Sequence, residues 1–569
     1  MPIIEINRQH FREILYDLPE EKLHWDEVKR TIPMMGASFE REDEETISFE
    51  FFPNRPDLYS VEGAARAYRS YVTSQPFSQD LYSLQGRSGI YLEVASSVLE
   101  VRPYIGCVMV RGVNIDENSL RSIMNVQEKL HMTLGRGRKK MAIGIHDFSP
   151  LYPPFRYLGA NPDEVSFLPL QGDREMTLAE ILKYHDKGVE YAHTLDGFPR
   201  YPVILDSKGQ VLSFPPIING ELTRVTEDTT DIFVDCTGTS LRVIEESLNI
   251  ITAQLIDLGG RAESVEIRYP PGAYERGESG GAELGIRETP PFEWTHLKIS
   301  LKDAKRLLGV EIEVEEAIEA LNRMGFPVQF LRGEVLEVSV PPMRVDILHP
   351  VDLFEDMAIG YGYGRFEGDL PKTPAFGEEL PGKELEGQLR ELMIGLKYQE
   401  VKTLTLVSEA ELKALEMDRE AGVEVINPLS EDHSALRPSL LPSLLGFLRN
   451  NRHRDFPQRV FEIGEVVRGG RNRFELWAVA VERKVGFTDV KSVAEYLMKS
   501  VGVNVKVERS KRAFFIRGRS AVLLGRAGEP LCEIGELHPE VLERYEITYP
   551  ATALRIDIDN LVEALSSGG

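Results

Sequence analysis

The chain has 569 residues, 42% of them hydrophobic and 28% charged, and carries a formal net charge of −25 at pH 7. A chain of this length is too long for one hydrophobic core and suggests about four domains at roughly 150 residues each. The acidic balance argues against a general nucleic-acid-binding protein, because affinity for phosphate grows with contacts from Lys and Arg. No stretch approaches the roughly 18 uninterrupted apolar residues of a membrane span, so no membrane association is expected.

The cysteines indicate a reducing compartment. Cys107, Cys236 and Cys532 lie far apart and share no C-x-x-C spacing, which favours reduced, buried thiols over a disulfide or a metal site. The first residues alternate charged with aliphatic side chains and contain no apolar region of the kind that a signal peptide needs. We therefore expect a cytoplasmic protein.

The N-terminal half is predicted to contain two folded regions. Residues 1–87 are expected to form an α/β module, in which ISFEFFPNRPDLYSVEGAARAYRSYV (47–72) predicts a strand, a turn at the prolines and a helix. Asp57 is the expected N-cap of that helix. Residues 88–268 mix short β-rich runs such as YIGCVMVRGV with helical patterns such as LRVIEESLNIITAQLIDLG, which predicts a compact α+β domain.

Two segments rich in Gly, Pro and Glu divide the rest of the chain. Residues 269–292 and 368–388 cannot bury enough apolar surface to be core elements, and both are predicted to be linkers. They bracket a small domain at 293–367. Residues 389–569 contain helical patterns and the strand-like runs RVFEIGEVVR, ELWAVAVE and SAVLLGRAG, which predict an antiparallel sheet flanked by helices. The expected fold class is multidomain α+β.

The segment PPMRVDILHPVDLFEDMAIGYGYGRF (341–366) crowds together four carboxylates, those of Asp346, Asp352, Glu355 and Asp356. Pro350 favours the first turn of a helix, which would place the last three carboxylates on one face. Like charges at that spacing cost roughly 0.2 to 0.5 kcal/mol per pair, while the helix dipole returns roughly 0.3 to 1 kcal/mol per acid. The cluster is therefore tolerable without a ligand, and its oxygen donors equally suit a hard cation such as Mg²⁺. The residues alone leave both interpretations open.

The signatures of one family occur in order along the chain. They are NRPDLYSVEGAARA, the acidic segment, NPLSEDHSALRPSLLPSLLGFLRNN and QRVFEIGEVV. Together they resemble the β-subunit family of phenylalanine–tRNA ligase (phenylalanyl-tRNA synthetase) in its compact archaeal and eukaryotic type, over nearly the whole chain. The resemblance implies an α2β2 heterotetramer in which the α subunit uses ATP to attach phenylalanine to its tRNA. It also implies that Asp346, Asp352, Glu355 and Asp356 bind Mg²⁺.

The resemblance gives each predicted region a role. It implies an editing domain of the B3/B4 type at 88–268, a winged-helix-like B5 domain at 293–367 and a catalytically inactive copy of the class II synthetase fold at 389–569. Class II sites hold the phosphates of ATP with arginines, because guanidinium groups bind phosphate in a bidentate way. Here the strand FEIGEV has Glu462 at the position of such an arginine, and the last motif retains only Arg544. We expect this domain to pack against an active counterpart rather than to bind ATP.

A ligase for phenylalanine needs a second selection step against tyrosine. An apolar pocket rejects one added hydroxyl by only about a hundredfold, so a hydrolytic pocket with a polar partner for the phenol is expected. The resemblance implies a pocket with Ile204 as an apolar wall and with the polar side chains of Ser213, Asn219, Asp235 and Thr237. From the residues alone, Asp235 and Thr237 would equally suit an ordinary Asx or ST turn.

No Ser/His/Asp or Cys/His constellation is predicted beside this pocket. His146 is expected to be a strand-end histidine and Cys236 a buried thiol, so hydrolysis would depend on a positioned water and on the terminal ribose hydroxyl of the tRNA. The basic run GRGRKK contains Arg136, Arg138, Lys139 and Lys140. These side chains would suit the phosphates of the tRNA acceptor end.

Three functions follow from these observations. The leading one is a β subunit that supports aminoacylation by the α subunit and hydrolyses mischarged tyrosyl-tRNA. An alternative is a non-catalytic scaffold or tRNA-binding subunit with an inactive editing pocket. A freestanding Mg²⁺-dependent hydrolase is disfavoured, because the acidic cluster lacks an accompanying nucleophile or a phosphate-binding glycine loop.

Overall fold

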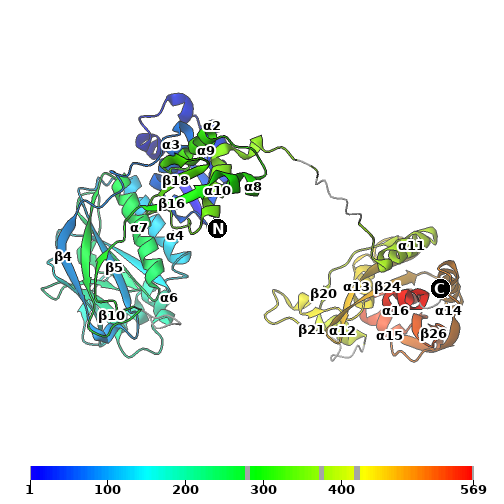
Figure 1. Ribbon diagram of the computed structural model, residues 1–569. Helices are drawn as coiled ribbons and strands as arrows, with labels where there is room; N and C mark the ends of the chain where they lie inside the picture. Colours follow the sequence, from blue (N-terminus) through cyan, green and yellow to red (C-terminus); the bar gives the residue numbers. More distant parts are fainter. Residues whose placement is uncertain (1, 276–281, 369, 371–376, 416–422, 567–569) are drawn as a thin grey trace. The chain divides into compact units, whose positions relative to one another are not determined.

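The computed structural model describes residues 2–275, 282–368, 370, 377–415 and 423–566 of the chain. The chain divides into two compact units, Met1–Leu370 and Pro371–Gly569, each of which has its own hydrophobic core (Figure 1). Across the described ranges, no helix combines the length and the apolar composition that crossing a membrane requires.

The first unit begins with a small antiparallel sheet and three helices. The strands are β1 (Ile3–Asn7), β2 (Ala37–Glu42) and β3 (Thr46–Phe51), in the order β1-β3-β2, and the helices are α1 (Arg8–Ile14), α2 (Trp25–Thr31) and α3 (Val61–Thr73). Ser60, rather than the predicted Asp57, caps α3, because its hydroxyl accepts the backbone N–H of Gly63. Asp57 instead accepts two hydrogen bonds from Arg55, at 2.8 and 2.9 Å.

A ten-stranded sheet forms the next part of unit 1. Its strands are β4 (Arg87–Val94), β5 (Tyr104–Arg111), β6 (Met141–Asp147), β7 (Phe155–Ala160), β10 (Tyr201–Leu205), β11 (Val211–Phe214), β12 (Ile218–Asn219), β13 (Ile232–Gly238), β14 (Arg261–Arg268) and β15 (Ile286–Thr289). They are ordered β12-β11-β10-β7-β4-β14-β5-β13-β6, with β15 added beside β14. Two short strands, β8 (Ser166–Phe167) and β9 (Met176–Thr177), pair separately.

Helices cover this sheet. They are α4 (Glu117–Met132), α5 (Leu178–Tyr184), α6 (Asp186–Tyr191) and α7 (Leu241–Asp257). Helix α7 packs against β5 and β13, and a glycine allows the close approach, because a Cβ at Gly106 would lie 2.7 Å from the side chain of Leu248. The prediction of a linker over 269–292 is wrong at its C-terminal end, where β15 joins the sheet. Thr289 explains the pairing, since its hydroxyl accepts from the N–H of Cys107 at 2.9 Å and donates to the carbonyl of Cys107 at 2.8 Å.

The last part of unit 1 contains the acidic segment. The antiparallel strands β16 (Thr295–Ser300), β17 (Val328–Arg332) and β18 (Val335–Val340), in the order β16-β18-β17, pack with α8 (Leu301–Leu308), α9 (Val314–Arg323) and α10 (Pro350–Tyr361). Pro350 begins α10, as predicted. Hydrogen bonds from Ser70 to the carbonyl of Asn322 (2.9 Å) and from Asn249 to that of Pro342 (3.2 Å) tie this region to the rest of unit 1.

The second unit is built on a seven-stranded sheet, β19 (Gln399–Glu400), β23 (Gln458–Arg468), β24 (Arg471–Val481), β25 (Lys506–Arg509), β26 (Phe515–Leu524), β27 (Pro530–Leu537) and β28 (Ala551–Asp557). The order is β19-β23-β24-β28-β27-β26-β25, and each described pair except β19–β23 is antiparallel. The helices are α11 (Pro381–Gly395), α12 (Glu409–Ala414), α13 (Leu441–Asn450), α14 (Phe487–Ser500), α15 (Pro539–Arg544) and α16 (Ile558–Ser566).

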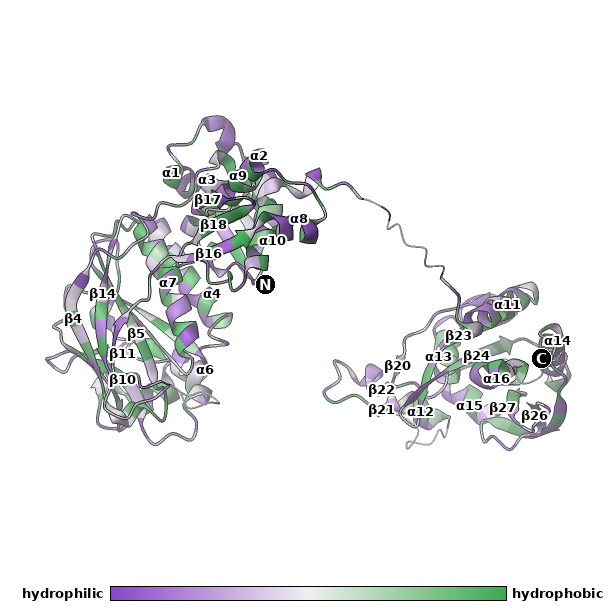
Figure 2. Cartoon of the chain, viewed as in Figure 1, coloured by the Kyte–Doolittle hydropathy of each residue, from purple (hydrophilic) through white to green (hydrophobic). Residues whose placement is uncertain are grey.

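Two separate cores lie in this unit. One combines sheet residues with α11, α14 and α16, and the other combines sheet residues with α13 and α15. Figure 2 shows β24 as largely hydrophobic, whereas α11 has hydrophobic and hydrophilic sides. A small sheet of β20 (Leu406–Val407), β22 (Ala435–Leu436) and β21 (Val423–Glu424) stands beside them.

Candidate functional site

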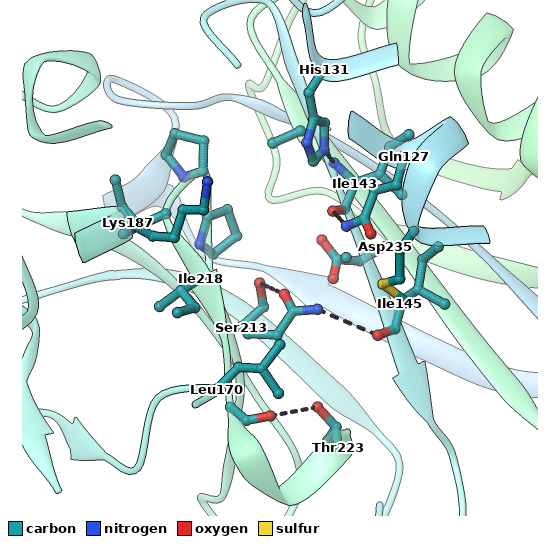
Figure 3. A pocket seen from close by; sticks show the side chains of 18 of the residues that line it. Gln127, His131, Ile143, Ile145, Leu170, Lys187, Ser213, Ile218, Thr223 and Asp235 are labelled. Atoms are coloured by element: carbon teal, nitrogen blue, oxygen red, sulfur yellow. Dashed lines mark hydrogen bonds between the residues drawn. The ribbon is translucent and has the colours of Figure 1, made fainter. Parts of the chain in front are cut away.

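A cavity of about 400 Å³ opens where the two end strands of the ten-stranded sheet approach each other (Figure 3). The amide of Asn219 on β12 donates to the carbonyl of Ile145 on β6 at 3.3 Å and joins the two edges. The volume lies in the range of pockets that hold small ligands. The residues that line the cavity include Gln127, His131, Ile143, Leu170, Lys187, Ser213, Ile218, Thr223 and Asp235.

Three of the five predicted pocket residues line this cavity: Ser213, Asn219 and Asp235. Ser213 pairs with Asn219 in the register of β11 and β12, so both side chains point to one face of the sheet. The hydroxyl of Ser213 donates to the side-chain carbonyl of Asn219 at 3.2 Å. Ile204 pairs with Ser213 from the next strand, but it is fully buried and does not belong to the cavity lining. The expectation that Ile204 forms the apolar wall is therefore not met.

Thr237 is also absent from the lining, because a buried arginine engages it. The Arg102 side chain donates to the hydroxyl of Thr237 at 2.9 Å and to its carbonyl at 2.7 Å. Burial lowers the pKa of the Arg102 guanidinium. The neighbouring Cys236 is a free, buried thiol, as predicted, and burial raises its pKa well above the ordinary value. Thr237 thus supports the structure behind the cavity rather than its surface.

Asp235 takes part in a constellation that the sequence did not predict. Its carboxylate oxygen Oδ2 lies 2.8 Å from Nε2 of His146, and Nδ1 of the same ring lies 2.8 Å from the hydroxyl of Thr223. Asp235, His146 and Thr223 are each at most 1% exposed. His146 lies near the end of β6, as predicted, and it also bridges two residues of the cavity wall, which the sequence did not indicate.

The basic run next to β6 divides into buried and exposed residues. Arg138 is 7% exposed, donates to the carbonyl of Ile217 at 2.9 Å and to Glu128 at 2.6 Å, and lies over the ring of Tyr191. It lines the cavity and fastens the loop, so the predicted role in binding tRNA phosphates is wrong for Arg138. Exposed cations from the same run are Arg136 and Lys139, and Lys140 is half-buried.

His131 is buried at the edge of the cavity in its neutral form. Its Nε2 accepts the backbone N–H of Ile143 at 2.8 Å, and Nδ1 lies 3.3 Å from Glu128. Only a neutral imidazole accepts a hydrogen bond at Nε2, and burial lowers the pKa of His131.

This geometry predicts a loss of stability in acid. Below about pH 6.5 the unfolded chain takes up a proton at His131 that the folded chain refuses, so the free energy of unfolding falls by up to about 1.4 kcal/mol per pH unit until the folded pKa is reached. His131→Gln keeps an acceptor without a titrating ring and should lose less stability between about pH 7 and about pH 5.5. Urea unfolding of both proteins at both pH values measures the difference. An identical loss in the two proteins would contradict the assignment.

The four predicted Mg²⁺ ligands line a second cavity, of about 320 Å³, together with Arg344. Arg344 is 3% exposed and donates to both oxygens of Asp346, at 2.9 and 2.7 Å, and to Asp356 at 2.5 Å. The Asp352 carboxylate accepts two backbone N–H groups at the start of α10, and Glu355 is exposed. The acidic segment predicted the four carboxylates but not their contact with the guanidinium of Arg344, which stands two residues before Asp346.

The charges in this cavity still leave room for a divalent cation. Arg344 balances one of the four carboxylates, and the other arginine in the lining, Arg55, is already paired with Asp57. Burial raises the pKa of Asp356 to about 6, against the attraction of Arg344. An acidic cavity with carboxylate donors fits Mg²⁺, which takes one or two carboxylates and keeps several waters.

A different group of possible ligands is the closest-spaced one in the described part of the chain. Ligand atoms of His10, Glu13 and Asp116 all lie within 4.8 Å of one another. The other side of the His10 ring contacts Glu62 at 3.1 Å. Burial alone would lower the pKa of His10, but the hydrogen bond and charge of Glu62, with Asp116 and Glu13, raise it. The His10 ring therefore lies among these carboxylates, and their charge favours its protonated form.

In unit 2, Glu462 points into the interior of the protein. It is fully buried on β23, lies 3.0 Å from Nη1 of Arg437 and accepts the hydroxyl of Thr403 at 2.5 Å. The charge of Glu462, which stands at the position of a phosphate-binding arginine, is therefore balanced inside the unit. Arg544 donates to the carbonyl of Ala414 at 2.8 Å and so supports the C-terminal end of α12.

Three domain models match the chain. The model described as the phenylalanyl tRNA synthetase beta chain CLM domain matches residues 367–558, the tRNA synthetase B5 domain matches 297–363, and the B3/4 domain matches 98–254. The residues that line the cavity, between Leu120 and Asp235, lie within the B3/4 match.

Curated relatives and a solved structure agree with these matches. The chain is 41% identical over 559 residues to the phenylalanine–tRNA ligase beta subunit of Archaeoglobus fulgidus, with 95% of this chain and 98% of the relative covered. It is 38% identical over 562 residues to that of Methanococcoides burtonii, with 98% and 100% covered. An N-terminal fragment of the phenylalanyl-tRNA synthetase beta subunit from Pyrococcus horikoshii matches with a TM-score of 0.57 and 32% identity, over 64% of this chain and 100% of the fragment. The chain belongs to the phenylalanine–tRNA ligase beta-subunit family.

Proposed function

We propose that this chain acts in the cytoplasm as the β subunit of phenylalanine–tRNA ligase, and that its 400 Å³ cavity hydrolyses tyrosyl-tRNA formed in error. One observation carries the editing assignment. Asp235 presents a buried carboxylate to a cavity whose other walls include Ile143, Leu170 and Ile218. A scaffold subunit would have no use for such a group, so the reading as an inactive pocket is not favoured.

The polar groups of the cavity suit selection of tyrosine over phenylalanine. A site built to pair with a hydroxyl rejects the analogue without it, because the polar groups of the site are then left unpaired. Asp235, Ser213 and Asn219 supply a carboxylate, a hydroxyl and an amide on one cavity. Phenylalanyl-tRNA would desolvate these groups without replacing their hydrogen bonds. We assign the hydrolytic step to a positioned water and the terminal ribose hydroxyl of the tRNA.

Exposed cations near the cavity suit the acceptor end of the tRNA. Arg136 and Lys139 stand on the loop that Arg138 fastens to the cavity wall. Phosphate contacts of this kind position a nucleic acid without reading its sequence.

The activation of phenylalanine with ATP belongs to an α subunit, within an α2β2 heterotetramer. Glu462 and Arg437 neutralise each other inside unit 2, so the position of Glu462 offers no cation to a triphosphate. Unit 2 also exposes apolar side chains beside its small sheet, among them Leu404 (65%), Ile426 (90%) and Leu429. Exposed apolar groups that gather in this way mark protein–protein contacts.

An exchange assay tests the division of labour. We expect no phenylalanine-dependent ATP–pyrophosphate exchange by this chain alone, and exchange once the α subunit is added. The complex should deacylate tyrosyl-tRNA at least about tenfold faster than phenylalanyl-tRNA, because only tyrosine satisfies the polar groups of the cavity. Exchange by the isolated chain would refute the role of the α subunit. Equal deacylation of the two substrates would refute the editing assignment.

Mg²⁺ is assigned to the acidic cavity of unit 1. Asp352 and Glu355 would hold the ion, with Asp346 and Asp356 contributing from their shared contact with Arg344. Bound there, the cation would neutralise the remaining negative charge and tie α10 to the preceding segment. This role is structural, because the cavity is separate from the one assigned to editing.

Calorimetry checks the metal assignment. Asp352→Asn and Glu355→Gln each remove one charge and should weaken Mg²⁺ binding by about tenfold or more, since the site relies on few carboxylates. Asp303→Asn is a matched control, because Asp303 is an acid in the first turn of α8, outside the cavity. Unchanged binding in both variants would show that Arg344 and the helix dipole alone balance the cluster.

A further inference from the structure

A series of hydrogen bonds links two sides of the editing cavity through the buried ring of His146. It begins at Oδ2 of Asp235, continues through Nε2 and Nδ1 of His146 to the hydroxyl of Thr223, and ends at the carbonyl of Gly220, which lies 3.2 Å from that hydroxyl. The two contacts of the imidazole ring are both 2.8 Å long. Because His146 is completely buried, it acts on a substrate only through its cavity-lining partners, Asp235 and Thr223.

This series of hydrogen bonds keeps the Asp235 carboxylate a hydrogen-bond acceptor in either charge state of His146. In the neutral ring, the hydroxyl of Thr223 donates to Nδ1, which leaves the proton on Nε2 for Asp235. In the protonated ring, Nδ1 donates to Thr223, whose hydroxyl then turns to the carbonyl of Gly220. In both arrangements Nε2–H donates to Oδ2. Asp235 therefore stays an acceptor, and no described side chain hydrogen-bonds to its other oxygen, Oδ1.

A glycine on the neighbouring strand makes this contact possible. Asp235 on β13 pairs directly with Gly144 on β6, and His146 lies two residues further along the same face. The Asp235 side chain lies across Gly144: a Cβ at that position would stand 2.2 Å from Oδ2 and 2.7 Å from Nε2 of His146. The φ angle of Gly144 is not in the left-handed region. Glycine is thus needed here for space and not for its backbone conformation.

From these contacts, and on the basis of the proposed editing function, we propose that His146 is a positioning residue for the discrimination between tyrosine and phenylalanine. By holding Oδ2 of Asp235, it directs Oδ1 into the cavity as an acceptor for a hydroxyl group of the aminoacyl side chain. A carboxylate free to rotate would pair with water or with Ser213 and Asn219, and would recognise the hydroxyl less well. His146 consequently controls specificity without contacting the substrate, and Thr223, which itself lines the cavity, holds the far side of the His146 ring.

Two substitutions of His146 separate positioning from packing. His146→Gln retains a donor at the place of Nε2, whereas His146→Asn reaches only toward Thr223 and leaves Asp235 unheld. Gly144→Ala perturbs the same contact from the opposite strand. Each is prepared in the complex with the α subunit, alone and combined with Asp235→Asn, and deacylation of tyrosyl- and phenylalanyl-tRNA is measured with the rate of ATP–pyrophosphate exchange and the thermal midpoint.

We expect His146→Asn and Gly144→Ala to lower kcat/KM for tyrosyl-tRNA by about tenfold and to reduce the tyrosine-to-phenylalanine ratio, while His146→Gln stays within about threefold of the wild type. Adding His146→Asn to Asp235→Asn should change nothing further, because the two residues act as one unit. Wild-type discrimination by His146→Asn, or an effect that multiplies with that of Asp235→Asn, would overturn the proposal. Thr223→Val gives the same decision if His146→Asn does not fold. Lack of tyrosyl-tRNA hydrolysis by the wild-type complex would instead refute the editing function itself.

Discussion

Asp235→Ala combined with Ser213→Ala is expected to reduce hydrolysis of tyrosyl-tRNA by the complex to the background rate. Asp235→Asn alone should lower kcat/KM by about 10- to 100-fold, since a hydrogen bond to a charged group contributes about 1.5 to 3 kcal/mol. The cause lies in the cavity, where the carboxylate is 1% exposed and cannot be replaced by bulk water. Single-turnover deacylation of preformed tyrosyl-tRNA measures the effect.

An acidic residue next to the same strand, β13, serves as a control for a general loss of folding. Asp231 directly precedes β13 and binds Arg111 at 2.8 Å, away from the cavity lining. Asp231→Asn should leave deacylation within about twofold of the wild type, as expected for an exposed pair. Exchange activity with the α subunit should be unchanged in all of these variants. Deacylation that survives the double substitution would place editing elsewhere in the complex.

Arg344→Met should destabilise unit 1 by about 3 to 5 kcal/mol, the usual cost of removing one partner from a buried ion pair. The substitution leaves Asp346 and Asp356 without their shared cation in a buried site. Adding Asp346→Asn and Asp356→Asn to Arg344→Met should recover part of the loss, because the uncompensated charges are then gone. Urea or thermal unfolding, monitored on the full chain, gives the midpoints.

A surface arginine provides the comparison. Arg365 pairs with Glu316 while about half of its side chain (53%) is exposed, so Arg365→Met should cost about 1 kcal/mol or less. Acidification also distinguishes the two sites. The loss caused by Arg344→Met should shrink toward about pH 5, because burial raises the pKa of Asp356 to about 6 and the unpaired carboxyl group then takes up a proton. Equal destabilisation by Arg344→Met and Arg365→Met would show that the buried network contributes little.

Much of the architecture was predictable from local patterns. Pro350 marked the start of α10, and the alternating and apolar runs around Phe461 and Ala478 indicated strands of a largely antiparallel sheet. Ser213, Asn219 and Asp235 were identified from the family resemblance, and all three line the main cavity. These predictions rest on signals that lie within one element or one motif.

The remaining features depend on contacts between distant segments. Thr223 lies 77 residues from His146, on the short turn of helix after β12, and the contact of β12 with β6 brings the two side chains to 2.8 Å. Arg344 is only two residues from Asp346 in the sequence, but its contact with Asp356 requires the turn before α10. The sequence could not show that the Glu462 side chain points into the interior, because helices cover both faces of its sheet. Alternation along such a strand does not distinguish a solvent side from an interior side.

The buried Glu462–Arg437 ion pair also limits which substitutions could give unit 2 a phosphate-binding cation at position 462. Replacing Glu462 with arginine would place two guanidinium groups together in the buried interior. Replacing Arg437 first would leave the buried carboxylate of Glu462 without its counter-charge. Each path thus begins with a poorly folded intermediate. A cation could therefore replace Glu462 only if Glu462 and Arg437 changed together.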